Sequence, residues 1–191
     1  RITIVGGYYG TGKSEFSLSL ALLLAKVQEL PVTLVDLDVV NPYFRSREVR
    51  PLLEAAGVHV IGNSLGIDKG VDIPAIPASV TAPLTDNRRV AVVDLGGDPA
   101  GARAMRQFRA QIPTEDADFL YVVNVFREEN RSAEGALDSL RSIEAALSMR
   151  VTGLVNNSHL LDETTVEHVL LGDGVCREIG ALSDQLPTQY V

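Results

Sequence analysis

Short apolar runs alternate with longer amphipathic segments from one end of the chain to the other. The runs are rich in valine, isoleucine and leucine, and several end at glycine or aspartate, which is typical of buried strands. Strands that alternate with helices predict an α/β domain with a mostly parallel sheet flanked by helices. The predicted strands occupy residues 2–5, 32–35, 58–61, 90–95, 119–123 and 151–155.

The segments between these strands carry apolar residues at helical spacing. The predicted helices occupy residues 13–29, 43–56, where Gly57 gives the stop signal, and 132–147. The first helix has one apolar face, made of Phe16, Leu20, Leu23, Leu24 and Val27. The pattern weakens over residues 62–87, where three prolines interrupt it, and again in the glycine-containing C-terminal part.

Composition places the chain among ordinary globular domains. Hydrophobic residues make up 46% and charged residues 22% of its 191 residues, which argues against a disordered or collagen-like chain. The sequence contains no internal repeat and no low-complexity linker, so we expect a single domain over residues 1–191.

Charge and cysteine content exclude several kinds of partner. A net charge of −8 argues against binding nucleic acid through a basic patch. The lone Cys176 cannot form an internal disulfide or a CxxC metal site, and it fits a reducing, cytoplasmic setting. The apolar stretch over residues 16–27 is too short to span a bilayer, so we expect no integral membrane segment.

The strongest chemical signal lies between the first strand and the first helix. The segment Gly7-Tyr8-Tyr9-Gly10-Thr11-Gly12-Lys13-Ser14 fits the phosphate-loop pattern G-x-x-x-x-G-K-[ST]. Its glycines let the backbone curl so that N–H groups point at phosphate oxygens, and the following helix adds its positive N-terminal end. In this pattern Lys13 contacts the β- and γ-phosphates and the Ser14 hydroxyl ligates Mg²⁺. We therefore expect these residues to bind nucleotide.

Aspartates follow two further strands, at the edge where open α/β sheets bind their ligands. Asp94 begins the string Asp94-Leu95-Gly96-Gly97, in which the carboxylate is placed to hold Mg²⁺ and the Gly97 N–H to sense a γ-phosphate. Asp36 and Asp38 alternate along an extended segment, so both point the same way. One of them supports the metal while the other orients water, although ordinary turn capping also explains such aspartates.

Together, the phosphate loop, Asp36-Leu37-Asp38 with Asn41-Pro42, and the Asp94 string resemble the MinD/ParA/CobQ-type P-loop NTPases, within the SIMIBI class. The resemblance runs from about residue 2 to residue 157 and implies a three-layer P-loop NTPase fold that binds ATP and Mg²⁺. It implies that Lys13 and Asp38 are catalytic, Asp38 by positioning the attacking water. Asp36 and Asp94 would serve the metal, and Asn156 would contact adenine.

The same resemblance predicts two switch segments, residues 38–45 and 94–100, and a nucleotide-dependent dimer. One position departs from the family pattern. Tyr8 stands where these proteins carry a second lysine that reaches the partner's nucleotide, which puts their standard dimer in doubt. Three roles are open for Tyr8 and Tyr9: they cover the phosphates, they dock a partner, or they simply pack at the loop.

Three functions fit these features. The first is an ATP-dependent switch that acts on a partner protein or a second copy of the chain. The second is an ATP-dependent ligase or kinase of the dethiobiotin-synthetase or cobyrinate-amidase type, with residues 62–87 as its acceptor loop. The third is a nucleotide-binding regulator without turnover. We expect adenine rather than guanine, because Asn156-Asn157-Ser158-His159 stands where guanine-specific proteins carry N-K-x-D.

Overall fold

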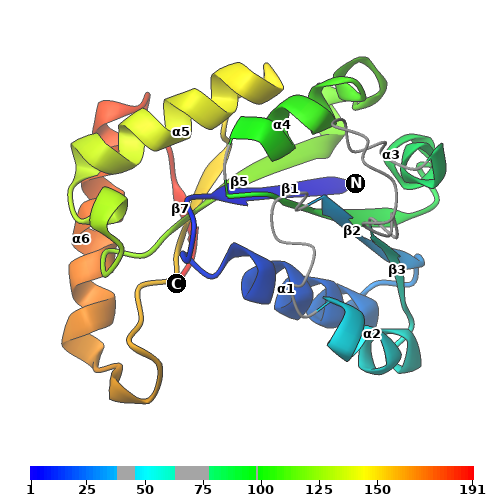
Figure 1. Cartoon of the computed structure of the whole chain (residues 1–191), viewed down its shortest axis with the longest axis horizontal. Helices are drawn as coiled ribbons and strands as arrows, with labels where there is room; N and C mark the ends of the chain where they lie inside the picture. The colour runs from blue at the N-terminus through cyan, green and yellow to red at the C-terminus, as the bar shows by residue number, and fades with distance from the viewer. Residues whose placement is uncertain (38–45, 63–77, 98) are drawn as a thin grey trace, which may run out of the picture.

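Seven parallel strands form one sheet in the part of the chain that the computed structural model describes, residues 1–37, 46–62, 78–97 and 99–191 (Figure 1). The strand order is β3-β2-β4-β1-β5-β6-β7, and every pairing between neighbours is parallel. The strands are β1 (Ile2–Gly7), β2 (Val32–Leu37), β3 (Val58–Gly62), β4 (Val90–Leu95), β5 (Ala117–Val123), β6 (Gly153–Asn156) and β7 (Thr188–Tyr190).

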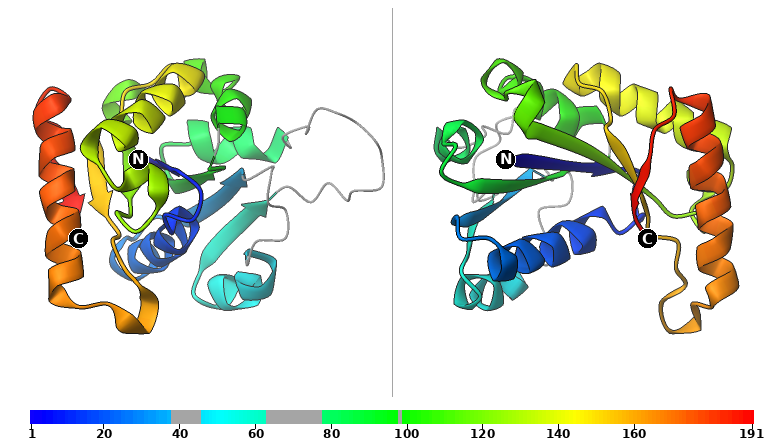
Figure 2. Two further views of the ribbon diagram at one scale, coloured as in Figure 1. Left: turned by 60° about the vertical axis from the view of Figure 1, so that its left-hand side comes forward. Right: turned by 180° about the vertical axis from the view of Figure 1, so that it is seen from behind.

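Helices cover both faces of this sheet, which confirms the predicted three-layer P-loop NTPase fold (Figures 1 and 2). The first face carries α1 (Lys13–Val27) and α2 (Ser46–Ala55). The second face carries α3 (Thr81–Thr85), α4 (Pro99–Arg106), α5 (Ala133–Leu147) and α6 (Val166–Leu182). None of the helices in the described ranges combines the length and the apolar character that a membrane crossing requires.

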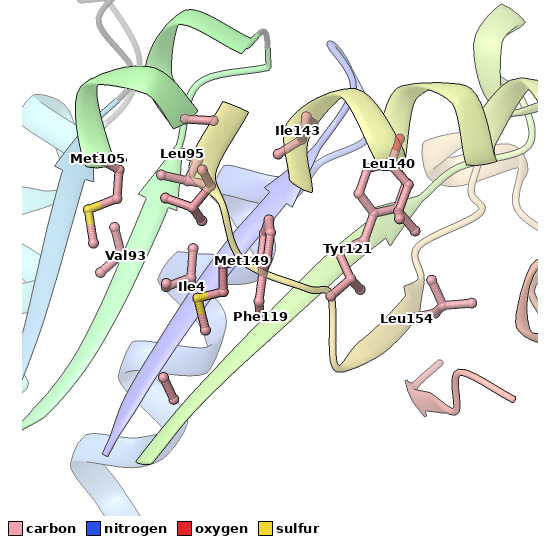
Figure 3. Packing of buried hydrophobic residues seen from close by; sticks show 14 of the residues in the cluster. Ile4, Val93, Leu95, Met105, Phe119, Tyr121, Leu140, Ile143, Met149 and Leu154 are labelled. Atoms are coloured by element: carbon pink, nitrogen blue, oxygen red, sulfur yellow. The ribbon is translucent and has the colours of Figure 1, made fainter. Parts of the chain in front are cut away.

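The central strands are buried on both sides, which is why they read as unbroken apolar runs in the sequence. In β5, Phe119 and Tyr121 point toward the face that carries α5 (Figure 3), whereas Leu120 and Val122 pack with residues of α1. Successive residues of a strand face opposite sides of a sheet, so one strand contributes to two separate cores. The sheet is thereby fixed in position between its two helical layers.

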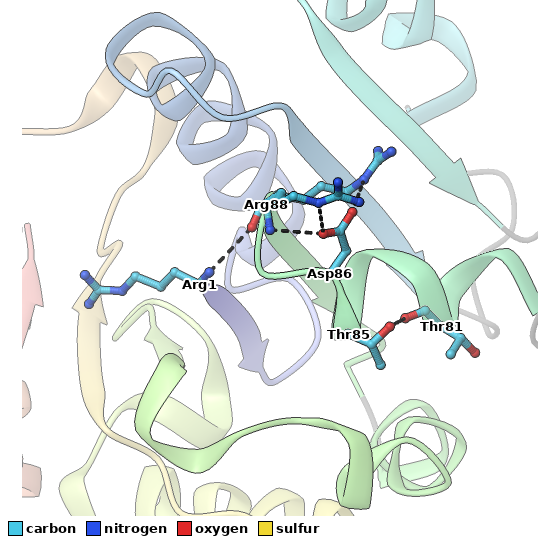
Figure 4. Close-up of polar contacts among 6 residues, drawn as sticks. Arg1, Thr81, Thr85, Asp86 and Arg88 are labelled. Carbon is cyan, nitrogen blue, oxygen red and sulfur yellow. Dashed lines mark hydrogen bonds and ion pairs between the residues drawn. The ribbon is translucent and has the colours of Figure 1, made fainter.

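The amino edge of the sheet carries several charged side chains at the surface. Asp86 accepts hydrogen bonds from the backbone N–H and the Nε of Arg88, both at 3.1 Å (Figure 4), and these bonds lower the pKa of the Asp86 carboxyl. Arg1 and Asp118 form another exposed pair at 2.6 Å. Exposed pairs of this kind contribute little stability. The opposite, carboxyl edge is where the chemically important residues gather.

Most of the predicted helices and strands are confirmed. The helix over residues 132–147 is an example in which the capping residues set the ends. The Ser132 hydroxyl accepts a hydrogen bond from the Gly135 N–H at 3.3 Å and caps α5, which ends before Ser148 in the left-handed region (φ 57°). The predicted apolar face of the first helix is wrong in part, because Leu23 and Val27 are 53% and 63% exposed. Residues 63–77, most of the predicted acceptor loop, lie outside the described residues.

The C-terminal part forms α6 and β7, which the glycine-containing sequence did not predict. The glycines have different surroundings within this helix. A Cβ on Gly172 would lie 2.2 Å from both Asn156 Oδ1 and Ser158 Oγ, so a side chain there would push α6 away from β6. A Cβ on Gly174 would meet nothing within 4 Å among the described residues. Close packing therefore requires Gly172, whereas Gly174 only weakens the helix.

Replacing these two glycines separately tests this packing. Gly172→Ala should lower the free energy of unfolding by about 1–3 kcal/mol, because the new methyl group overpacks the contact with β6. Gly174→Ala should raise it by about 0.5–1 kcal/mol, because alanine favours an exposed helical position. Urea denaturation of both variants measures the two effects. Equal effects of the same sign would contradict the packing of α6 on β6.

Candidate functional site

The turn between β1 and α1 has the backbone conformation that a phosphate loop needs. Gly10 and Gly12 adopt left-handed conformations with φ of 71° and 85°, which other residues adopt only with strain. The Thr11 hydroxyl and the Thr11 N–H both donate to the Tyr8 carbonyl oxygen, at 2.9 Å and 3.4 Å. The loop is therefore closed on itself directly before α1 begins.

The start of α1 places the lysine and the serine of the phosphate-loop pattern inside the candidate site. Gly12 is the N-cap residue, and no side chain of the described residues caps the helix. Lys13 and Ser14 are only 6% and 7% exposed. Unsatisfied N–H groups and the helix dipole make such a terminus favourable for an anion. The left-handed glycines, the start of α1 and the buried Lys13 therefore lie together in one turn.

The two aspartates predicted to serve a metal lie side by side on neighbouring strands. Asp36 of β2 and Asp94 of β4 are register partners, so both side chains leave the sheet on the same face. That face is the one covered by α1, because Leu34 and Val92, two positions earlier, pack in the α1 cluster. Asp94 is 5% exposed, and Asp36 is half-buried.

No group of three His, Cys, Asp or Glu residues within the described ranges can hold a metal ion by itself. A magnesium ion at Asp36 and Asp94 therefore has to share its coordination with other oxygens, such as the Ser14 hydroxyl and phosphate. This donor set, hard oxygens in a partly completed shell, is what Mg²⁺ prefers when it binds together with a nucleotide. The residues present fit the ion that the sequence predicted.

Two residues that sequence reasoning missed hold the phosphate loop from outside. Arg127 Nε donates to the Gly10 carbonyl oxygen at 2.8 Å, across 117 residues of sequence. Asn157 Nδ2 donates to the Thr11 carbonyl oxygen at 2.7 Å, across 146 residues. Both follow strands, β5 and β6, on the same side of β1. Their position at the carboxyl edge was the only signal the sequence offered.

A cavity of about 180 Å³ opens beside the loop and is lined by Phe126, Arg127, His159, Leu160 and Leu161. Arg127 connects it to Gly10, and His159 Nε2 lies 3.7 Å from where a Cβ of Gly12 would be. His159 Nδ1 accepts a hydrogen bond from the Leu161 N–H at 3.2 Å, so in neutral histidine Nε2 carries the proton. The cavity is lined by apolar side chains together with the polar groups of Arg127 and His159.

Asn156, predicted to contact adenine, is built into the protein instead of facing open space. Its Nδ2 donates to the Val169 carbonyl oxygen at 2.9 Å, and its Oδ1 accepts from the Ser158 N–H at 3.1 Å. The side chain is 4% exposed. These bonds tie α6 to the loop that carries Asn157 and His159, and the adenine contact stays a prediction.

The remaining predicted residues divide into described and undescribed ones. Gly97 is buried next to the Tyr9 ring, and Lys13 Nζ lies 5.9 Å from the centre of that ring. Asp38 and the first switch segment, residues 38–45, lie outside the described residues, as does Asp98. The predicted second switch segment, residues 94–100, contains the end of β4 and the start of α4.

Solved structures share this architecture at low sequence identity. The chain aligns with the cell division protein FtsY from Thermotoga maritima (TM-score 0.63, 23% identity, 98% of this chain and 59% of that one). It also aligns with FlhF complexed with GMPPNP and Mg²⁺ (TM-score 0.54, 12% identity, 98% and 64%). A third match is a nucleotide-binding protein from Archaeoglobus fulgidus in complex with ADP (TM-score 0.58, 16% identity, 100% and 80%).

At 12–23% identity these likenesses show the fold alone, a parallel sheet between two layers of helices, and they do not favour the MinD/ParA branch. The chain spans about three fifths of the length of the FtsY structure. No protein-family model and no curated protein matches the sequence.

The external hydrogen bond from Asn157 can be tested without any ligand. Asn157→Ala removes the bond to the Thr11 carbonyl oxygen, and we expect faster hydrogen–deuterium exchange across residues 10–14 and a loss of about 1 kcal/mol in unfolding free energy. Asn87→Ala, at an exposed position before β4, is the control and should leave exchange in this loop unchanged. Unchanged exchange in Asn157→Ala would show that the bond does not hold the loop.

Proposed function

We propose that this chain binds a nucleoside triphosphate with Mg²⁺ at the β1–α1 turn, ATP in preference to GTP, and hydrolyses it as a molecular switch. The observation that carries the proposal is the closed loop itself. Left-handed Gly10 and Gly12 lead into an α1 terminus where Lys13 and Ser14 are buried. Backbone N–H groups and one lysine bind phosphate without a basic surface, which is consistent with a net charge of −8.

The residues at the carboxyl edge supply the other roles. Lys13 carries positive charge to the β- and γ-phosphates, and Ser14, Asp36 and Asp94 would hold the metal. Bound Mg²⁺ neutralises phosphate charge and orients the phosphate chain. The Gly97 N–H would contact the γ-phosphate, and Asp38 would orient the attacking water. Support for this division comes from the register of Asp36 with Asp94 on the face covered by α1.

The base preference rests on the cavity beside the loop. Guanine offers donors at N1 and at its exocyclic amine, so a selective site needs a carboxylate acceptor. At the position where that acceptor would stand, His159 presents Nε2–H, because its Nδ1 already accepts from Leu161. A donor matches the ring nitrogens of adenine. The fold itself accommodates both bases, since the FlhF structure contains GMPPNP and the A. fulgidus structure contains ADP.

The switch would act on a protein partner or on a second copy of the chain. The MinD/ParA proteins carry a second lysine that contacts the nucleotide of the partner subunit. This chain has Tyr8 at that position, so it would not make that lysine contact. We therefore expect any self-association to differ from the lysine-dependent dimer of the MinD/ParA proteins.

A matched pair of lysine variants tests the nucleotide site. Lys13→Ala should weaken binding of Mg·ATP at least about a hundredfold, because it removes a buried cation from the phosphates. Lys26→Ala changes the same charge on the exposed end of α1 and should bind like the original chain. Isothermal titration calorimetry measures both. Tight binding retained by Lys13→Ala would rule out the β1–α1 turn as the phosphate site.

A second variant tests the base preference. His159→Asp introduces the acceptor that guanine requires, so the ratio of GTP to ATP affinity should rise at least about tenfold. His59→Asp, on the edge strand β3, makes the same charge change far from the cavity and should leave the ratio unchanged. Competition binding with both nucleotides gives the ratio. A chain that already prefers GTP, or a ratio that His159→Asp does not move, would contradict the assignment of His159.

A further inference from the structure

The Tyr9 ring lies directly against Gly97. Its Cδ1, Cγ and Cε1 atoms are 2.7, 3.0 and 3.1 Å from the point where a Cβ on Gly97 would be. A side chain at position 97 would collide with the ring, so this contact exists because residue 97 is glycine. The ring therefore brings the phosphate loop into contact with the segment that follows β4.

The same ring is within range of Lys13. Lys13 Nζ lies 5.9 Å from the ring centre, a distance at which an ammonium group is attracted to an aromatic face. Lys13 and Gly97 are the two groups to which the proposed function assigns the γ-phosphate. Tyr9 contacts Gly97, to which only the γ-phosphate is assigned, and it lies within cation–π range of Lys13, which is assigned to both the β- and the γ-phosphate.

A second tyrosine holds the ring in this position. The rings of Tyr8 and Tyr9 meet edge to face, with centroids 5.8 Å apart and planes at 83°. The Tyr8 hydroxyl hydrogen-bonds to Glu129, in the segment after β5, and this bond raises the pKa of Tyr8. Tyr9 is nevertheless 40% exposed, so solvent is available for the ring to move into.

From these contacts we infer that the Tyr9 ring blocks the γ-phosphate position at Gly97 until it is displaced, and that the site therefore favours nucleoside diphosphate over triphosphate. We call the ring in this position the Tyr9 plug. A diphosphate binds with the ring still packed on Gly97, whereas a triphosphate binds only by displacing it. This inference rests on the proposed function. Binding of a triphosphate would then change the environment of Tyr8 and of Gly97, because the ring that contacts both of them moves.

The test compares the affinities of Mg·ATP and Mg·ADP, measured by calorimetry in the full chain. Tyr9→Ala should raise the affinity for ATP at least about fivefold more than that for ADP, because only ATP has to displace the ring. Tyr9→Phe keeps the ring that lies against Gly97, so the ratio of the two affinities should stay that of the original chain. Tyr190→Ala removes a ring of similar exposure, 39%, on β7 and is the matched control.

A spectroscopic measurement tests the motion without removing the ring. With fluorotyrosine incorporated and the Tyr9 signal assigned by comparison with Tyr9→Phe, ATP should shift that signal strongly and ADP weakly. If the original chain binds neither nucleotide, the proposed function itself fails. If it binds both, and Tyr9→Ala changes the two affinities by the same factor or not at all, the plug is wrong while the proposed function stands.

Discussion

The turn from β1 into α1 has to expose backbone N–H groups on its inner side, and the remainder of the carboxyl edge is arranged around this requirement. Only glycine adopts the conformations at positions 10 and 12 without strain, and within the loop the Thr11 hydroxyl bonds to the Tyr8 carbonyl oxygen. Further support comes from outside the loop, through Arg127 on the Gly10 carbonyl and Asn157 on the Thr11 carbonyl. These two bonds hold the carbonyl groups of Gly10 and Thr11 from segments far away in the sequence.

The all-parallel sheet makes this support possible. Because all strands point the same way, the segments after β1, β2, β4, β5 and β6 reach one edge, although they are far apart in sequence. The register of β2 with β4 pairs Asp36 with Asp94, while β5 and β6 bring the two supporting side chains to the other side of the loop. The proposed metal ligands and the two loop-supporting side chains therefore lie on opposite sides of the phosphate loop.

Much of this arrangement could be predicted from sequence because it depends on local patterns. The motif over residues 7–14 and the position of Asp94 after an apolar run follow from spacing and strand ends alone. The contact of Arg127 with Gly10 could not be predicted, because it depends on β5 lying next to β1, and strand order leaves no local pattern. The structure does not describe Asp38, so its role in orienting water stays a prediction.

The C-terminal helix shows a different limit of sequence reasoning. Glycines normally weaken a helix, and several of them in one segment argued against a long one. In the structure Gly172 lets α6 approach the amide of Asn156, and this close contact orients the loop that carries Asn157 and His159. The residue that obscured the helix in the sequence is thus one that positions the candidate base cavity.

The central claim is that this loop holds a nucleotide together with Mg²⁺ for turnover. The most direct measurement is phosphate release from ATP at several protein concentrations, with Mg²⁺ and with a chelator in its place. We predict slow release that requires Mg²⁺, with a specific rate that rises with protein concentration if two copies act together. Release that is equal with the chelator, or no release above the rate without protein, would contradict the account.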